Sequence, residues 1–326
     1  MTTFVGIDVG KSTLDVAISG HPQVRRIANT PAGWAELITL LTTADRSCIV
    51  LEATNRYHEG VATALAKAGT PVAIANPLHT AAFRRSEGQL AKTDALDARV
   101  LLRFAEQKQP GPTARPTRSQ RGVRDLARTR ADLVETRVRT HLQASAAPEA
   151  VVASYAPVLA TLTAQIAALD IALATAIAAD PDLAHKDALL QSLPGMGPTT
   201  SAGLLANLPE LGTLDRRRIA SLAGLAPRNR ESGRQVARPV VWGGRSDVRR
   251  IVYLVAAGAI QRRRSGAPAQ GAEVIRARYD RLLARGKSTK QALVAVARWL
   301  ITILNVMLRD ALRWEETRAA QGGATR

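Results

Sequence analysis

The sequence predicts an α/β domain at the N-terminus, followed by a helical segment and a mostly helical C-terminal domain. Three observations support this prediction. Strand and helix patterns alternate through the first hundred residues, a proline- and glycine-rich run at 109–116 interrupts them, and helical periodicity dominates afterwards. At 326 residues and 46% hydrophobic composition, the chain is long enough for two or three domains with substantial cores.

The N-terminal pattern begins with a hairpin. Apolar runs at 5–9 and 14–18 flank the turn Gly10-Lys11-Ser12, and a strand near 24–28 completes an antiparallel meander. A helix at 30–41, a strand at 48–52, a helix at 57–68 and a strand at 71–75 are expected next. A three-stranded meander followed by βαβ units describes a ribonuclease-H-like sheet, in which the centre of the first strand neighbours the end of the next parallel strand.

Two long helices are predicted after the break. Residues 118–143 combine an apolar stripe with seven arginines and only three acids, which favours phosphate contact over a merely solvated face. Residues 151–179 are rich in alanine and leucine, as in a helical hairpin or coiled coil that dimerises. We therefore expect domains at 1–110, 117–182 and 186–316, with a disordered tail at 317–326.

Composition points to a polyanionic partner. Forty-five basic residues against 27 acidic ones give a formal charge of +18 and a pI near 11.2, for which nucleic acid is the default partner. The single cysteine, Cys48, excludes a disulfide framework and a cysteine–histidine zinc site. No signal peptide is recognised, and the apolar run at 292–308 is interrupted by Arg298 and Asn305, so a cytoplasmic protein without a membrane span is expected.

Four acids on separate predicted elements suggest one metal site. Asp8 sits in an apolar strand, Glu52 ends another, and Asp94 and Asp97 share one face of a helix that Thr93 can cap. Buried acids cost free energy unless something binds them, and hard oxygen ligands suit Mg²⁺ or Mn²⁺. Each acid also has a simpler explanation: a turn acid, a strand-end charge, or a helix N-terminal charge favoured by the dipole.

The C-terminal half is strongly basic. Residues 228–264 hold ten arginines against Glu231 and Asp247, a density that indicates phosphate contact. Four of them are candidate phosphate clamps: Arg228, Arg230, Arg234 and Arg245. The run Leu193-Pro194-Gly195-Met196-Gly197 between helices resembles a helix-hairpin-helix turn, where Gly195 and Gly197 would bring the backbone close to a nucleic acid, although it is also typical of a plain tight turn.

A serine within this basic region is a candidate nucleophile. In Arg230-Glu231-Ser232-Gly233-Arg234 the surrounding guanidinium groups would stabilise both an alkoxide and a pentacoordinate phosphorus transition state. Ser246 has a similar setting, and most loop serines are only caps, so the pattern alone does not decide between them.

In this order, the motifs resemble a known family. Over nearly its whole length, the chain is similar to the DEDD insertion-sequence transposases, the one-hundred-and-ten family. The motifs that carry the similarity are Gly6-Ile7-Asp8-Val9, Glu52-Ala53-Thr54, 92–98, 193–197, 224–227, Glu231-Ser232-Gly233 and 242–245. The resemblance implies a RuvC-like N-terminal domain with Asp8, Glu52, Asp94 and Asp97 as metal-binding acids, a coiled coil, and a C-terminal transposase domain.

The resemblance also implies a mechanism and partners. Ser232 is expected to form a transient 5′-phosphoserine link to donor or target DNA, guided by a structured RNA from the element's own flank. The protein is expected to act on the nucleoid as a homo-oligomer, a dimer or tetramer, in which the acids of one subunit meet the serine of another.

Three other functions compete with this one. A RuvC-type Holliday-junction resolvase would hydrolyse DNA with the four acids and water, leaving Ser232 a bystander. A sugar-kinase or actin-like phosphotransferase would use the hairpin at 6–12, although the basic C-terminal half and the lack of a second phosphate loop argue against it. A non-catalytic nucleic-acid-binding protein would use the acids structurally. Gly10-Lys11-Ser12 is not part of a Walker motif. That motif needs a glycine five residues before Gly10, and this position is Val5.

Overall fold

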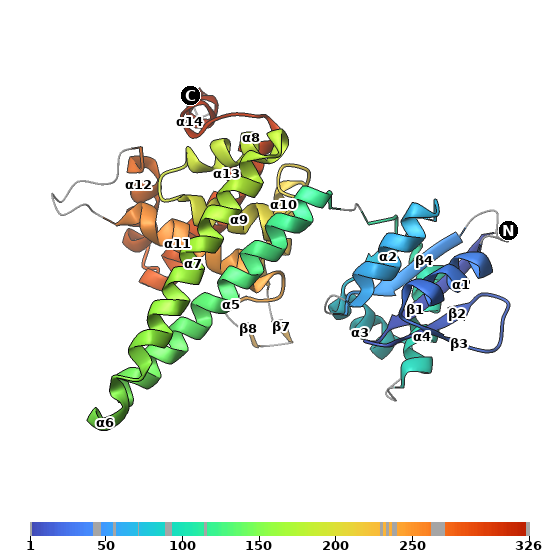
Figure 1. Cartoon of the computed structure of the whole chain (residues 1–326). Helices are drawn as coiled ribbons and strands as arrows, with labels where there is room; N and C mark the ends of the chain where they lie inside the picture. The colour runs from blue at the N-terminus through green and yellow to red at the C-terminus, as the bar shows by residue number, and fades with distance from the viewer. Residues whose placement is uncertain are drawn as a thin grey trace. The chain divides into compact units, whose positions relative to one another are not determined.

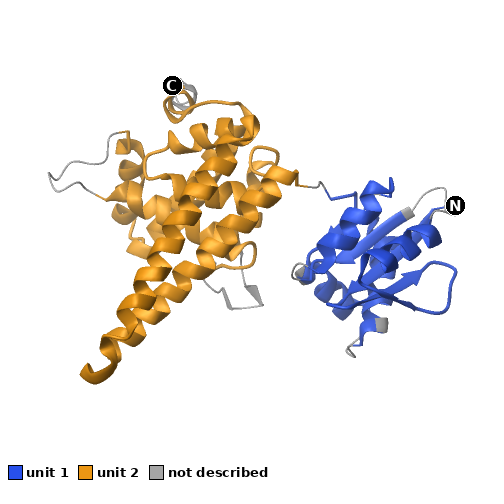
Figure 2. Ribbon diagram, in the orientation of Figure 1, with its two compact units in different colours: residues 1–115 blue, residues 116–326 orange. Residues whose placement is uncertain are grey.

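A computed structural model of the chain divides into two compact units, Met1–Arg115 and Pro116–Arg326 (Figure 2). It describes residues 2–41, 47–54, 57–70, 72–88, 93–113, 116–228, 231–232, 235–236, 240–261 and 271–323. The division falls within the predicted proline- and glycine-rich break at 109–116. Each unit has its own hydrophobic core.

The first unit contains a five-stranded mixed sheet. Its strands are β1 (Thr3–Val9), β2 (Thr13–Ile18), β3 (Arg25–Ala28), β4 (Ser47–Glu52) and β5 (Val72–Ala75). Their order is β3-β2-β1-β4-β5, antiparallel from β1 to β3 and parallel from β1 through β4 to β5. This is the ribonuclease-H-like topology that the sequence predicts, so the fold class of this half is confirmed.

Helices cover both faces of the sheet (Figure 1). On one face, Val5, Ile7 and Val9 join a core with α1 (Pro31–Leu41) and α2 (Tyr57–Lys67). On the other, Val50 and the alanines of β5 pack against α4 (Asp94–Lys108), and α3 (Pro77–Ser86) contacts α4 through aromatic rings. Because strand side chains alternate, every second residue of β1 faces α4.

The second unit begins with a long helical hairpin. Helix α5 (Arg118–Ala146) starts at a capping box of Thr117 and Gln120, passes through the short α6 (Glu149–Val152), and returns as α7 (Tyr155–Ala178) beside α5 (Figure 1). The sequence predicts a separate segment at 117–182. In the structure, however, Val123, Leu173 and Ile177 pack into the same core as the helices that follow.

The rest of the second unit is a helical bundle with four short strands. Its helices are α8 (Pro181–Gln191), α9 (Pro198–Asn207), α10 (Arg216–Leu222), α11 (Ser246–Ile260), α12 (Glu273–Ala284) and α13 (Thr289–Arg309). The strands β6 (Pro227–Arg228) and β9 (Val240–Val241) pair with each other, as do β7 (Glu231–Ser232) and β8 (Gln235–Val236). The mostly helical C-terminal domain that the sequence predicts is confirmed.

Among the described residues, two helical stretches are long and apolar enough to cross a membrane by length and composition alone, Glu149–Ala178 and Thr289–Arg309. The apolar window of α13 is 61% buried inside the unit, so this helix is a core helix, as predicted. The corresponding window of the first helix is only 11% buried, which leaves much of the apolar surface of α7 facing outward.

The end of the chain differs from the prediction of a disordered tail at 317–326. Helix α14 covers Trp314–Gly323. Trp314 is 2% exposed and its indole donates a hydrogen bond to the carbonyl of Gly271, and Thr317 is buried as well. The polar composition of this segment predicts disorder, but the buried side chain of Trp314 anchors the start of α14.

Candidate active site

Asp8 and Glu52 lie side by side at the centre of the sheet. Ile7 pairs with Leu51 in the parallel ladder of β1 and β4, so the next residue of each strand is an acid. Alternation along the strands places both acids on the face that α4 covers. The predicted neighbourhood of the first strand's centre and the next parallel strand's end is therefore confirmed.

A glycine allows α4 to approach the strand that carries Asp8. A Cβ on Gly6 would lie 2.1 Å from the backbone nitrogen of Leu102 and 2.4 Å from the carbonyl oxygen of Ala98. Contacts this short exclude any larger side chain unless the helix moves. Gly6 and Asp8 are two residues apart on a strand and therefore lie on the same face of the sheet. The missing side chain at Gly6 lets α4 pack close to the strand beside Asp8.

The start of α4 supplies two more acids. The side chain of Thr93 accepts a hydrogen bond from the backbone N–H of Leu96 at 3.3 Å, which confirms the predicted cap and makes Asp94 the first helical residue. Asp94 is exposed, whereas Asp97, one turn later, is 8% exposed. The helix N-terminus is a favourable place for both negative charges.

The four acids act on one another electrostatically. The pKa of Asp8 is raised from 3.8 to about 6, first because the side chain is partly buried, and then because of the negative charges of Asp97, Asp94 and Glu52. A smaller contribution comes from Asp15. The structure therefore brings the four predicted acids into one electrostatic cluster around Asp8.

Two side chains that the sequence analysis missed hold members of this cluster. A guanidinium nitrogen of Arg84 lies 2.9 Å from a carboxylate oxygen of Asp97, and only 18% of the Arg84 side chain is exposed. The hydroxyl of Thr80 donates a hydrogen bond of 2.7 Å to the carboxylate of Glu52. Both residues belong to α3, whose sequence carries no signal for this role.

A fifth acid borders the cluster. Asp15 is the direct cross-strand partner of Asp8, is 5% exposed, and receives two hydrogen bonds from Arg26 at 3.0 and 3.2 Å. Arg26 also lies 3.4 Å from Asp94, and it thus links two acids of the site. The signal for Asp15 was available, because a hairpin that pairs residues 9 and 14 also pairs residues 8 and 15.

The donor set fits a divalent cation in kind and in charge. Carboxylate oxygens are the ligands that hard cations take, and a cation would stabilise the ionised form of Asp8, whose pKa is raised by partial burial and by the negative charges of its neighbours. Among the described residues, no three acids stand close enough together to enclose an ion as they are placed. Binding would therefore require these side chains to turn toward one another.

In the second unit, the backbone around Gly224 packs directly against the backbone of Gly243 and Gly244, and we call this contact the glycine clasp. A Cβ on Gly224 would lie 2.2 Å from the carbonyl oxygen of Gly243, and one on Gly244 would lie 2.3 Å from the nitrogen of Gly224. All three glycines have positive φ angles, which disfavours other residues there. The Arg249 guanidinium donates to the Gly243 carbonyl at 2.8 Å and completes the clasp.

The candidate serine lies on a hairpin that begins and ends at this clasp. The backbone of Ser232 belongs to β7 and pairs with Gln235 of β8, and the flanking strands β6 and β9 lead back to Gly224 and Gly243. Arg228 lies on β6. Arg230 and Arg234 lie outside the described residues, so the predicted arrangement of arginines around Ser232 stays a prediction.

Arg245 has an internal partner. Its guanidinium donates to both carboxylate oxygens of Glu210, at 2.6 and 2.7 Å, and to the carbonyl of Asn207 at 2.9 Å. Burial alone would raise the pKa of Glu210, but the hydrogen bond and charge of Arg245 lower it below its ordinary value. Arg245 would have to leave Glu210 to clamp a phosphate, which the sequence could not reveal. Ser246 begins α11 directly after it.

The predicted helix-hairpin-helix turn has a structural explanation at Gly195. Its φ is +89°, and a Cβ there would lie 2.8 Å from the carbonyl of Val255, so glycine permits the turn to pack on α11. Gly197 caps α9 with open space around it. Nucleic-acid contact by these two glycines stays a prediction.

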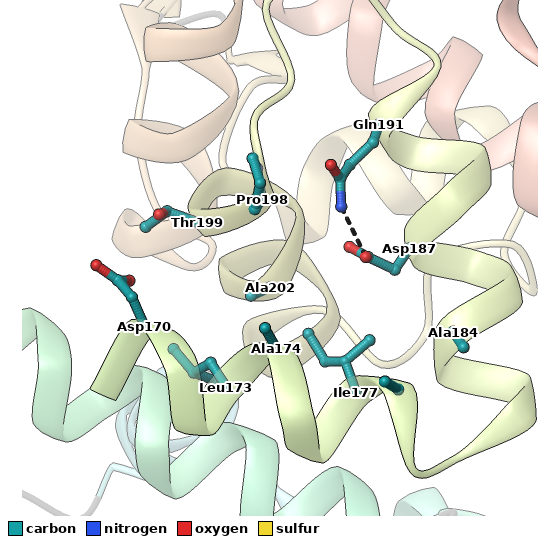
Figure 3. A pocket seen from close by; sticks show the side chains of 11 residues that line it. Asp170, Leu173, Ala174, Ile177, Ala184, Asp187, Gln191, Pro198, Thr199 and Ala202 are labelled. Atoms are coloured by element: carbon teal, nitrogen blue, oxygen red, sulfur yellow. Dashed lines mark hydrogen bonds between the residues drawn. The ribbon is translucent and has the colours of Figure 1, made fainter. Parts of the chain in front are cut away.

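A cavity of about 310 Å³ adjoins this turn, between α7, α8 and α9 (Figure 3). Asp170 and Asp187 line opposite sides of a mostly apolar wall. Asp187 accepts hydrogen bonds from Gln191 and Ser201, and Asp170 pairs with Arg130 of α5. These acids disfavour a phosphate inside the cavity. The ion pair of Asp170 also shows that Arg130, on the basic face of α5, is engaged within the hairpin of α5 and α7.

Comparison with known proteins agrees with this architecture. A transposase family model, DEDD_Tnp_IS110, matches residues 5–148, and a second, described as transposase IS116/IS110/IS902 family, matches residues 187–271. The chain belongs to the IS110 family of transposases. As an IS110-family member it is a DNA transposase, and the two matches cover the acidic cluster and the serine hairpin respectively.

Relatives of the IS110-family chain include proteins named for gene inversion and for insertion elements. It is 26% identical to a "Pilin gene-inverting protein" of Moraxella bovis over 94% of this chain and 96% of that protein. It is 36% identical to a protein of insertion element IS110 from Streptomyces coelicolor, over 39% of this chain and 30% of that protein. A solved RuvC of Thermus thermophilus, in complex with a Holliday junction substrate, is 14% identical and covers 35% of this chain and 100% of its own, at a TM-score of 0.26.

Proposed function

We propose that this transposase cuts and rejoins DNA through a covalent serine intermediate, assisted by a divalent metal ion at the acidic cluster. The observation that supports the metal-binding half is the gathering of four carboxylates at the sheet and at the start of α4, where partial burial and then the charges of Asp97, Asp94 and Glu52 raise the pKa of Asp8 to about 6. The serine half rests on the resemblance and on the place of Ser232 in a basic hairpin.

The proposed chemistry is a transesterification. The Ser232 Oγ forms a bond to phosphorus while the bond to the 3′ oxygen breaks, so that a 5′-phosphoserine and a 3′ hydroxyl result, and the serine proton ends on the released oxygen. Attack by another 3′ hydroxyl reverses the step and reseals a strand. The linkage conserves the phosphodiester bond energy, and no nucleotide hydrolysis is needed.

The chain's own acids would hold the metal, Mg²⁺ or Mn²⁺. Asp8, Glu52, Asp94 and Asp97 are the proposed ligands, while Thr80 and Arg84 orient two of them. A bound divalent cation supplies positive charge beside the scissile phosphate. Arg228, Arg230 and Arg234 are proposed phosphate contacts around Ser232.

The partners we propose are donor DNA, target DNA and a structured RNA from the element, and the protein would work in the cytoplasm on the nucleoid. The RNA rests on the family resemblance, with the formal charge of +18 as general support for polyanion binding.

The decisive experiment combines purified protein, Mg²⁺, RNA transcribed from the flanking DNA and a nicked donor substrate, and seeks an adduct that survives denaturation. We expect an adduct that is lost in Ser232→Ala and in Asp97→Asn, with Ser246→Ala as the matched control that retains it. Cleavage without an adduct that persists in Ser232→Ala would make the protein a hydrolytic RuvC-like nuclease instead.

We also propose that α5 and α7 mediate a homo-oligomer, either a dimer or a tetramer. Large apolar side chains are exposed on this hairpin, among them Leu142 at 64% and Ile171 at 69%. Replacing both with glutamine should lower the mass measured by light scattering while the circular dichroism spectrum stays that of the folded protein, whereas Gln143→Ala should change neither. An unchanged mass in the double variant would place the interface elsewhere.

A further inference from the structure

A second cavity in the C-terminal unit has a basic lining. It lies where the start of α10, the middle of α12 and the C-terminal half of α13 meet, and its volume is about 330 Å³, at the small end of the range for ligand pockets. Its lining includes three arginines and no acid: Arg216, Arg278, Trp299, Thr302, Ile303, Asn305, Val306 and Arg309.

Arg278 is the central cation of this pocket. Its guanidinium carbon lies over the Trp299 ring, 4.9 Å from the ring centre, a cation–π contact that restricts the side chain. Its Nε is buried and has no hydrogen-bond acceptor among the described residues. A buried donor without an acceptor costs free energy until one arrives.

The charges around Arg278 are positive. Burial lowers its pKa, and the guanidinium groups of Arg281 and Arg216 lower it further. Positive charges gathered without an acid repel one another, and an anion between them removes that repulsion. Arg309 on the opposite rim already pairs with Asp310 at 2.7 and 2.8 Å and keeps further N–H donors for a ligand.

The floor of the pocket is preorganised. Asn305 is 2% exposed, accepts a hydrogen bond from the N–H of Gly212 and donates one to the carbonyl of Leu214, so the turn before α10 is held against α13. Asp215 caps α10 by accepting from the backbone N–H groups of Arg217 and Arg218. The position of Arg216, the first residue of that helix, is thereby fixed.

We propose that this pocket binds a phosphate group of a nucleic-acid backbone, with Arg278 and Arg216 as the principal ligands and Arg309 at the rim. Arginine forks match the oxygens of a phosphate, and a guanidinium that is already restricted loses little freedom on binding. The inference rests on the chain's being a DNA transposase and is independent of the proposed serine chemistry.

The test measures binding of one labelled oligonucleotide sequence, made once as DNA and once as RNA, over a series of salt concentrations. Arg278→Gln and Arg216→Gln should weaken binding and lower the slope of log Kd against log salt by about one, as expected for one lost phosphate contact. Arg298→Gln is the matched control, because Arg298 is exposed on α13 and does not line the pocket. The loss of affinity in Arg298→Gln should be smaller than in Arg278→Gln or Arg216→Gln.

The two nucleic acids identify the source of the phosphate. A loss confined to the RNA assigns the pocket to the RNA, a loss confined to the DNA assigns it to the DNA, and equal losses indicate a backbone contact common to both. Inorganic phosphate should raise the melting temperature of the wild type more than that of Arg278→Gln at equal ionic strength.

Other outcomes would overturn the proposal. Equal weakening by Arg298→Gln would reduce the effect to overall charge, and stabilisation by acetate without any change in oligonucleotide binding would indicate a carboxylate site. If Arg278→Gln has a lower melting temperature than the wild type, the binding measurements on Arg216→Gln alone test the proposal, because Arg216 is exposed. The binding assay involves no chemistry at Ser232, so failure of the serine proposal would be seen separately, as an adduct or cleavage that is retained in Ser232→Ala.

Discussion

Asp97 is the one acid among the four predicted ligands that is classed as buried, and Arg84 holds it in place. If these acids bind a divalent cation, Mg²⁺ or Mn²⁺ should raise the melting temperature of the wild type, because a ligand that binds only the folded state stabilises it. We expect this rise to be lost in Asp97→Asn and retained in Glu106→Gln, a charge-matched change on the exposed side of α4. Differential scanning fluorimetry with and without chelator measures both. An equal rise in the two variants would refute a metal site at Asp97.

A second residue-scale prediction concerns Glu210 and Arg245. The folded-state pKa of Glu210 lies below its ordinary value of 4.5, so the pair stabilises the fold fully above that pH and loses this contribution as the pH falls through the folded-state value. Since both side chains are about a third exposed, we expect Glu210→Gln to cost no more than about 1 kcal/mol at neutral pH. Urea unfolding of both proteins should show this difference shrinking in acid. A constant difference would mean that packing, and not charge, stabilises the pair.

At the scale of elements, the approach of α4 to β1 decides whether the acids meet. Gly6→Ala places a Cβ within 2.4 Å of two α4 backbone atoms, so we expect the free energy of unfolding to fall by about 1–3 kcal/mol, as overpacking does. Because α4 has to shift, metal-dependent adduct formation should fall as well. Chemical denaturation provides the measurement.

Gly111→Ala is the control for that change. No atom lies within 4 Å of the position a Cβ would take there, and its unfolding should resemble that of the wild type. A Gly6→Ala protein of normal stability and activity would show that the contact of α4 with β1 is looser than the structure describes.

At the scale of the whole molecule, each unit has the means to fold by itself. Residues 1–115 enclose their own cores on both faces of the sheet, and residues 116–326 share one large core. We expect a fragment of residues 1–115 to give a cooperative thermal transition by circular dichroism, and the full chain to give two transitions by calorimetry. A fragment without a cooperative transition would mean that the first unit depends on the second.

The local features of this protein could be predicted from its sequence. Period-2 apolar runs predicted the meander, Thr93 and the acids after it predicted the start of α4, and the break at 109–116 predicted where the first unit ends. These features depend on residues close together in the chain, so propensity and spacing are enough to find them. The family could also be recognised, because its motifs keep their order along the sequence.

The pairing of side chains from separate elements depends on the three-dimensional fold. Arg84 with Asp97, Thr80 with Glu52, Arg245 with Glu210 and the clasp of Gly224 with Gly243 each join separate elements, and spacing along the chain says nothing about such contacts. The basic pocket around Arg278 draws on three helices in the same way. The physical reason is that burial and charge act through space, so the chemistry of a site depends on which distant elements the fold packs against it.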